Sequence, residues 1–246
     1  MCIILSVPPK KVINPRWLVN AANNHVDGWG YMYADKGRLY VHKDTNCENV
    51  NDILAAIAYE RESNPESHFF IHFRAASYGD VSIQNTHPIT INEDVCIVHN
   101  GSFAIDKQDK RKSDTAELAE ALSKFTTEEL RSKQVQFLLE TLCREAQGFV
   151  GMMFSDGSFK IFNEDNGIEE KGIWFSNNTY KKLFNIIRFR PEKHYWTNDY
   201  DCSRCVSCGN ELNLKKENKF CEVCSSKLIH TFSSGSKRKE SETSTR

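Results

Sequence analysis

The first residues constrain the fold more than any other stretch, because they place a cysteine directly in front of an apolar run. Met1 and Cys2 are followed by apolar residues at 3–5, a pattern that predicts a buried strand holding this end of the chain inside the fold. Removal of Met1, which a small second residue permits, would leave the Cys2 thiol beside its own α-amine. An α-amine with an ordinary pKa of about 7.7–8.0 can take the thiol proton near neutral pH. Cys2 could therefore supply both nucleophile and base, although a second-position cysteine also occurs by chance.

Composition predicts a single large domain with room for a small appendage. The chain has 246 residues, of which 39% are hydrophobic and 11% aromatic, enough for a substantial core. The formal net charge of -1 gives no reason to expect a nucleic-acid or membrane partner. No apolar run approaches the ~20 residues of a spanning helix, and no signal-peptide pattern precedes the first strand. We therefore expect a cytoplasmic protein without a membrane association.

Hydrophobic periodicity predicts strands, then helices, then strands again. The helical patterns cover residues 15–24, 51–62, 114–125 and 128–146. The strand patterns cover residues 3–7, 69–74, 95–99 and 174–176, with hairpins at 29–42 and 149–162. Antiparallel pairs joined by turns favour a layered α+β domain over alternating βαβ units.

Three polar positions at the ends of these elements are candidates for a site, and each has an ordinary structural alternative. Arg74 ends an apolar strand and could grip a carboxylate, or could pair with an acid at a sheet edge. The Asn100-Gly101 dipeptide could form an oxyanion hole, or could be a tight turn. Asp114 opens a helix after Ser113, a plausible N-cap, and could bind a cation or complement the helix dipole.

The order of several short motifs along the chain is a more specific indication of a protein family than any one of these motifs. The chain carries Cys2, DGWG at 27–30, HFRAASYGD at 72–80, NTHPI at 85–89, VHNG at 98–101 and SDT at 113–115. This order resembles the class II glutamine amidotransferases, which belong to the N-terminal-nucleophile (Ntn) hydrolase superfamily, over roughly residues 2–180. The resemblance implies a four-layer αββα sandwich with the site where two antiparallel sheets meet. It also implies hydrolysis of the L-glutamine side-chain amide, with the ammonia passed to an acceptor.

The resemblance also implies a role for each matching position. Cys2 corresponds to the nucleophile, Arg74 to the clamp on the substrate α-carboxylate with Ser77 assisting, Asn100 and Gly101 to the oxyanion hole, and Asp114 to the partner of the α-ammonium. The histidines of the same motifs, His72, His87 and His99, are interpreted as structural, and residues 27–30 as shaping a loop near the nucleophile. The chain departs from the family at Ala75, where Trp is common, and at Tyr78, where His is common.

A second signal lies in the last quarter of the chain. Two CxxC pairs, Cys205 with Cys208 and Cys221 with Cys224, are separated by twelve residues and could close a four-thiolate zinc site. Cys202 is a spare candidate ligand, and the alternatives are a redox dithiol or two CxxC motifs that occur by coincidence. The expected organisation is an amidotransferase domain at 2–195, a small zinc ribbon at 200–230 and a disordered polar tail at 233–246. Basic residues in the ribbon could contact nucleic acid, a protein or only solvent.

These observations predict an enzyme, a glutaminase that supplies ammonia to a separate synthetase in trans. Longer family members carry the ammonia-using domain after the amidotransferase domain, and here the cysteine-rich segment follows instead. Two alternatives stay open. The chain could be an N-terminal-nucleophile amidohydrolase acting on another amide, or a weakly active scaffold whose ribbon binds nucleic acid or a protein partner. No cofactor other than the structural zinc is expected.

Overall fold

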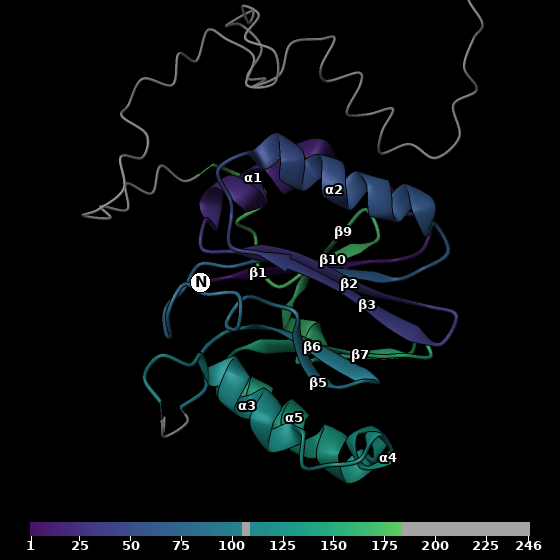
Figure 1. The fold of residues 1–246 in the computed structure, drawn as a ribbon, viewed down its shortest axis with the longest axis vertical. Coiled ribbons are helices and arrows are strands. Elements are labelled where there is room, and N and C mark those ends of the chain that lie inside the picture. Colours follow the sequence, from purple (N-terminus) through teal and green to yellow (C-terminus); the bar gives the residue numbers. More distant parts are fainter. Residues whose placement is uncertain (105–108, 184–246) are drawn as a thin grey trace, which may run out of the picture. The chain divides into compact units, whose positions relative to one another are not determined.

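The computed structural model describes residues 1–104 and 109–183, which belong to the first of two compact units, Met1–Phe189. The predicted zinc ribbon and the predicted polar tail lie outside the described residues, as do the four cysteines proposed as zinc ligands. Within the described part of the chain, helices and antiparallel sheets combine as expected for the α+β class (Figure 1).

The larger sheet has six strands, and the N-terminal strand lies inside it. Its spatial order is β3-β2-β4-β1-β10-β9. The strands are β1 (Ile3–Val7), β2 (Trp29–Asp35), β3 (Arg38–Asp44), β4 (Phe69–Phe73), β9 (Ile168–Glu170) and β10 (Ile173–Phe175). All five residues of β1 are buried, as are all five of β4, which explains why both appear in the sequence as nearly continuous apolar runs. The chain terminus is thereby held between β4 and β10.

The smaller sheet has four strands in the order β5-β6-β7-β8. These are β5 (Ile89–Asn92), β6 (Val95–Asn100), β7 (Phe149–Phe154) and β8 (Phe159–Phe162), each antiparallel to its neighbours. Every residue of β6 and β7 is buried. The polar end of β6, His99 and Asn100, is thus enclosed rather than exposed as in an ordinary turn.

Helices cover the outer face of each sheet, so that Figure 1 shows helices, sheet, sheet and helices in succession. On the side of the larger sheet lie α1 (Pro15–Asn24) and α2 (Val50–Ser63). Against the smaller sheet pack α3 (Asp114–Leu122), α4 (Thr127–Arg131) and α5 (Lys133–Glu145). The face predicted for the second helix is the one that is buried: Ile53, Leu54, Ile57 and Ala58.

The two sheets share a core in which side chains from both interdigitate. One cluster joins Ile4, Met32 and Phe70 of the larger sheet to residues of the smaller sheet, among them Val98 and Met153. At β7 the sheets approach closely, since a Cβ added to Gly151 would lie 2.9 Å from the Phe70 ring. This packing brings the ends of β1, β4 and β6 to one region of the domain, where the site lies.

Three sequence-based expectations about elements were wrong. The helix predicted over 128–146 is two helices, because Ser132 adopts an extended conformation (φ -63°, ψ 146°) and accepts a hydrogen bond from the Val135 N–H as the N-cap of α5. The helix predicted to end at 125 ends at Leu122. Strands β5 and β9 were not predicted, since each is at most four residues long and exists through its pairing with β6 or β10.

No helix in residues 1–104 and 109–183 combines the length and apolar character needed to cross a membrane.

Candidate active site

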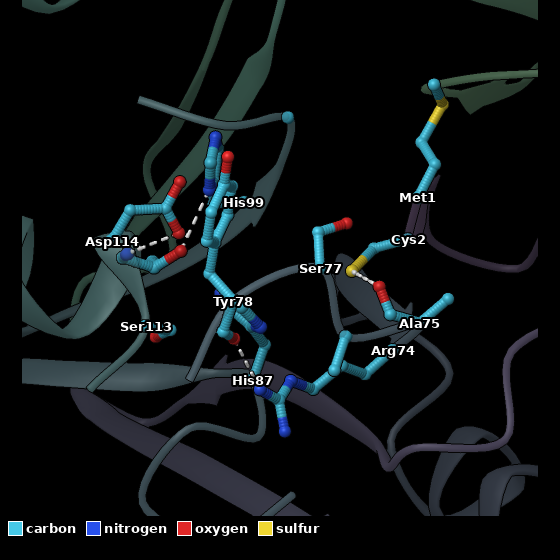
Figure 2. Close-up of a pocket in the computed structure, with 13 residues that line it drawn as sticks. Met1, Cys2, Arg74, Ala75, Ser77, Tyr78, His87, His99, Ser113 and Asp114 are labelled. Atoms are coloured by element: carbon cyan, nitrogen blue, oxygen red, sulfur yellow. Dashed lines mark hydrogen bonds between the residues drawn. The ribbon is translucent and has the colours of Figure 1, made fainter. Parts of the chain in front are cut away.

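A pocket opens where the N-terminal strand meets the loops that follow β4 and β6 (Figure 2). Its empty volume is about 350 Å³, a figure that includes the part open to solvent. The residues lining it come from five separate stretches: Met1 and Cys2, 74–78, His87, His99 with Gly101, and 113–115.

Two neighbouring strands bring Cys2 and Arg74 together. In the antiparallel pair of β1 and β4, Ile3 is opposite Phe73. Cys2 immediately precedes β1 and Arg74 immediately follows β4, so the register places both at the same end of the sheet. The Asn177 side chain donates a hydrogen bond to the Cys2 carbonyl oxygen at 2.7 Å and ties this terminus to the segment after β10. Strand pairing therefore brings together two residues that are 72 positions apart in the sequence.

Cys2 is a half-buried free cysteine whose thiol faces the pocket. It lies 3.7 Å from the Ala75 carbonyl oxygen, to which it donates a weak hydrogen bond. Burial raises the pKa of the Cys2 thiol above its usual value, although the terminal amine and Arg74 oppose the increase. A thiol in this setting needs a base to become a nucleophile. The chain in the structure begins at Met1, so the free α-amine there is that of Met1 and not of Cys2. Met1 lines the pocket and is 70% exposed.

The Arg74 side chain lines the same pocket as Cys2 and is anchored by backbone carbonyls. Only 2% of Arg74 is exposed, and its side chain donates hydrogen bonds to the carbonyl oxygens of Asp80 (3.0 Å) and Tyr78 (3.2 Å). Burial lowers the pKa of Arg74, whereas Cys2 and Asp114 act in the opposite direction. Both of these groups are thus close enough to interact with the guanidinium, which has further N–H donors available for a ligand.

Asp114 faces the pocket from the first turn of α3, where Ser113 is the N-cap as expected. Asp114 is 5% exposed, and its carboxylate accepts hydrogen bonds from the backbone N–H groups of Phe103 (2.7 Å) and Thr115 (2.9 Å). The first of these bonds fixes the loop that follows Gly101. A carboxylate has lone pairs left after two such bonds, so the same group can also receive a cation from the pocket.

Asn100 and Gly101 end β6 in a conformation that requires glycine. Gly101 has φ +150°, and a Cβ there would lie 2.8 Å from the Gly148 Cα. Gly101 lines the pocket, but Asn100 is absent from the described residues that line it. The Asn100 amide is 3% exposed and donates a hydrogen bond to the Ser176 hydroxyl at 2.8 Å.

The histidines of the motifs form a buried, uncharged cluster behind the pocket. The rings of His72 and His87 are 4.2 Å apart, and those of His87 and His99 are 6.5 Å apart. Burial lowers the pKa of all of them, that of His99 to about 4. His99 bonds to the Thr115 hydroxyl at 2.8 Å and stacks on Phe103 at 4.2 Å, which links β6 to α3. These contacts agree with a structural role, although His87 and His99 also line the pocket.

The loop at 27–30 supports the segment after β4. The Asp27 carboxylate accepts a hydrogen bond from the Ala76 N–H at 2.8 Å, and the Asp27 N–H donates to the Arg74 carbonyl at 2.9 Å. The Arg74 N–H in turn donates to the Gly28 carbonyl at 2.7 Å. Gly30 cannot be replaced without movement, because a Cβ would collide with the carbonyl oxygens of His42 and His87. The loop thus bonds to the segment whose Ala75 carbonyl accepts from the Cys2 thiol, in agreement with the expectation that it supports the region around the nucleophile.

The family model described as glutamine amidotransferases class-II matches residues 17–203, more than half of the chain. The chain belongs to the class-II glutamine amidotransferases. The matched segment of this amidotransferase includes Arg74, Asn100 and Asp114, and it begins after Cys2.

Two further proteins resemble this amidotransferase. An uncharacterized protein of Methanocaldococcus jannaschii is 27% identical over 110 residues, which cover 42% of the present chain and 30% of the archaeal one. A solved structure of glutamine phosphoribosylpyrophosphate amidotransferase from B. subtilis, complexed with ADP and GMP, is 11% identical with a TM-score of 0.42, covering 71% of this chain and 41% of that one. The amidotransferase chain thus spans less than half of either protein.

The structure brings most of the predicted site residues together. Cys2, Arg74, Ser77, Gly101 and Asp114 line one pocket, and Figure 2 shows Ser77 beside Cys2. The sequence assigned no role to Thr115 or to Ser176, whose contacts with His99 and Asn100 join separate segments of the chain. The part of the chain that the structure describes contains no group of His, Cys, Asp or Glu side chains arranged to hold a metal ion.

Proposed function

We propose that this amidotransferase hydrolyses the side-chain amide of L-glutamine to glutamate and ammonia. The observation that carries the proposal is the convergence of a thiol, a guanidinium and a carboxylate in one pocket from β1, the end of β4 and the start of α3. Glutamine presents an α-carboxylate, an α-ammonium and a side-chain amide carbon. A selective site needs one group for each of these features, and Arg74, Asp114 and Cys2 are the matching set.

The two charged side chains would bind the substrate backbone. Arg74 is anchored by backbone carbonyls and offers its remaining N–H donors to the α-carboxylate, with the Ser77 hydroxyl beside it. Asp114 would receive the α-ammonium. Because both side chains are buried, their interactions with a bound substrate are only weakly screened by solvent.

Cys2 would be the nucleophile once Met1 is removed. The buried thiol gives its proton to the Cys2 α-amine, and the sulfur attacks the amide carbon. The Gly101 N–H and the Asn100 amide stabilise the resulting oxyanion. The carbon–nitrogen bond then breaks as the α-ammonium returns the proton to the departing nitrogen, which leaves as ammonia. Water, deprotonated by the same amine, attacks the γ-glutamyl thioester and releases glutamate and the free thiol.

The ammonia would be used by a separate synthetase in trans, as the family membership suggests in general terms. The two CxxC pairs, Cys205 with Cys208 and Cys221 with Cys224, would hold one structural zinc ion. This part of the proposal rests on the chemistry of the donor set, because four thiolates at this spacing are a typical structural zinc site.

A second candidate function is hydrolysis of another amide. Ala75 and Tyr78, which stand where many family members have Trp and His, both line the pocket. A smaller residue at one position and a larger one at the other change the shape of the pocket around the substrate. A comparison of glutamine with asparagine and with γ-glutamyl amides as substrates would separate the two candidates.

The decisive experiment measures glutamate release from glutamine by the purified full-length chain. We expect release by protein whose N-terminal residue is shown by mass spectrometry to be Cys2. We expect none above background by Cys2→Ala or by protein that keeps a residue before Cys2. Cys47→Ala is the matched control, because Cys47 is another half-buried free cysteine, and it should keep full activity. Unchanged release by Cys2→Ala would refute the proposed mechanism.

A further inference from the structure

The Ser176 hydroxyl lies at the junction of the two sheets, directly after β10. Ser176 is 4% exposed and makes hydrogen bonds to two different strands. Its Oγ accepts one from the Ile4 N–H of β1 at 2.9 Å and one from the Asn100 side-chain amide of β6 at 2.8 Å. One oxygen atom therefore connects β1, the strand that directly follows Cys2, with the residue that precedes Gly101.

The position of this oxygen is determined by β1. Besides the bond to its Oγ, the Ser176 N–H donates to the Ile4 carbonyl at 3.1 Å, so Ser176 and Ile4 are joined by two hydrogen bonds. Ile4 is two residues from Cys2 in a fully buried strand. A shift of the nucleophile strand would carry the Ser176 oxygen with it.

The orientation of the Asn100 amide depends on this oxygen. The terminal torsion of an asparagine side chain has broad minima, so the side chain does not by itself select an amide orientation. In the described part of the chain, the Asn100 Oδ1 atom is buried and has no hydrogen-bond partner, whereas Nδ2 donates to Ser176. Because the amide is planar, fixing one N–H on Ser176 also fixes the direction of the second.

We infer that Ser176 is a positioning residue, which sets the orientation of the Asn100 amide next to the pocket residue Gly101 and keeps that amide in register with Cys2. The inference rests on the proposed function. Removal of an oxyanion-hole donor commonly lowers kcat by about 100- to 1000-fold, and an unaimed donor retains part of that effect. Ser176→Ala should therefore lower kcat by roughly 10- to 100-fold. The KM for glutamine should change little, since Arg74 and Asp114 hold the parts of the substrate that do not react.

The test is a double-mutant cycle on the full-length chain, with kcat and KM for glutamate release measured in each variant. In the wild type, Ser176→Ala should show the loss of kcat. In the Asn100→Ala background, the same change should alter kcat less than about twofold, because no amide remains to be aimed. A purely structural Ser176 would lower kcat by the same factor in both backgrounds, and that result would overturn the inference.

Ser6→Ala is the matched control for the loss of a buried hydroxyl. Ser6 lies on β1 itself, is also 4% exposed, and bonds to His68 at 2.8 Å rather than to Asn100. It should change kcat by less than about threefold. If Ser176→Ala does not fold, as judged by circular dichroism, Ser176→Cys replaces it in the cycle, since a thiol is a weak hydrogen-bond acceptor of similar shape.

Glutamate release by wild-type protein with a free N-terminal Cys2 distinguishes failure of the Ser176 role from failure of the proposed function. Release of glutamate by the wild type together with equal losses in both backgrounds overturns the role of Ser176 and leaves the function intact. Absence of Cys2-dependent release in the wild type overturns the function and this inference with it.

Discussion

Asp114→Asn tests whether the carboxylate binds substrate or only holds a loop. The structure gives Asp114 a structural role, because its oxygens accept the backbone N–H groups of Phe103 and Thr115. Asparagine keeps one carbonyl oxygen of nearly the same shape and can retain the bond from Phe103. It removes the negative charge that the α-ammonium of glutamine would require. The substitution therefore separates the charge of Asp114 from its shape.

The expected magnitudes follow from the burial of this side chain. Asp114 is 5% exposed, so a charge-assisted hydrogen bond to the substrate is worth about 1.5–3 kcal/mol. Its loss should lower kcat/KM for glutamine by roughly 10- to 150-fold, mainly through KM, because the contact is the same in the ground and transition states. The lost bond from Thr115 should cost about 1 kcal/mol of stability, which lowers Tm by about 2–4 °C.

The assay compares two substrates. Glutaramate is glutamine without its α-amino group, so the wild-type enzyme should use it less well than glutamine by about the same factor. Asp114→Asn should use both substrates with similar kcat/KM, since neither then has an ammonium partner. An equal loss on both substrates would show that Asp114 acts through the loop after Gly101 and would refute its assignment to the α-ammonium.

Two other properties can be predicted. Burial holds the pKa of His72 and His87 well below 6.5 and that of His99 at about 4, so these side chains take up protons in the unfolded chain before they do so in the folded one. Their contribution to stability is complete above pH ~6.5 and is lost as the pH falls toward ~4, by about 1.4 kcal/mol per pH unit for each group. Urea unfolding from pH 7 to 5 should show this decline with a shallower slope in His99→Gln, and an unchanged slope would contradict it. Elemental analysis of the full chain should find about one zinc per molecule, and a metal-free protein with four freely reactive thiols at 205, 208, 221 and 224 would reject the ribbon.

Local patterns in the sequence predicted most of the elements correctly. Strands β1, β4 and β6 are buried on both faces, and a strand of this kind appears as an apolar run that needs no knowledge of its neighbours. The face of α2 that packs against the larger sheet was likewise visible as helical periodicity. Short elements such as β9 were missed, because their residues become a strand only through pairing with a neighbour.

The candidate site was predicted as a set of residues, and its arrangement was not. The order of motifs indicated Cys2, Arg74, Gly101 and Asp114, which do line one pocket. The same motifs did not reveal that the Asn100 amide is turned toward a hydroxyl 76 residues away. That contact joins two sheets, and no local pattern in either segment encodes it.

The sequence by itself determined which side chains are available for chemistry and which stretches are apolar enough to be buried. These properties depend on residue type and on spacing of a few positions, so they can be read along the chain. The tertiary structure alone decided that the thiol, the guanidinium and the carboxylate share a pocket, and that Ser176 bonds to both sheets. Such relations depend on strand register and on the packing of one sheet against another, which arise when the whole chain buries its apolar surface at once.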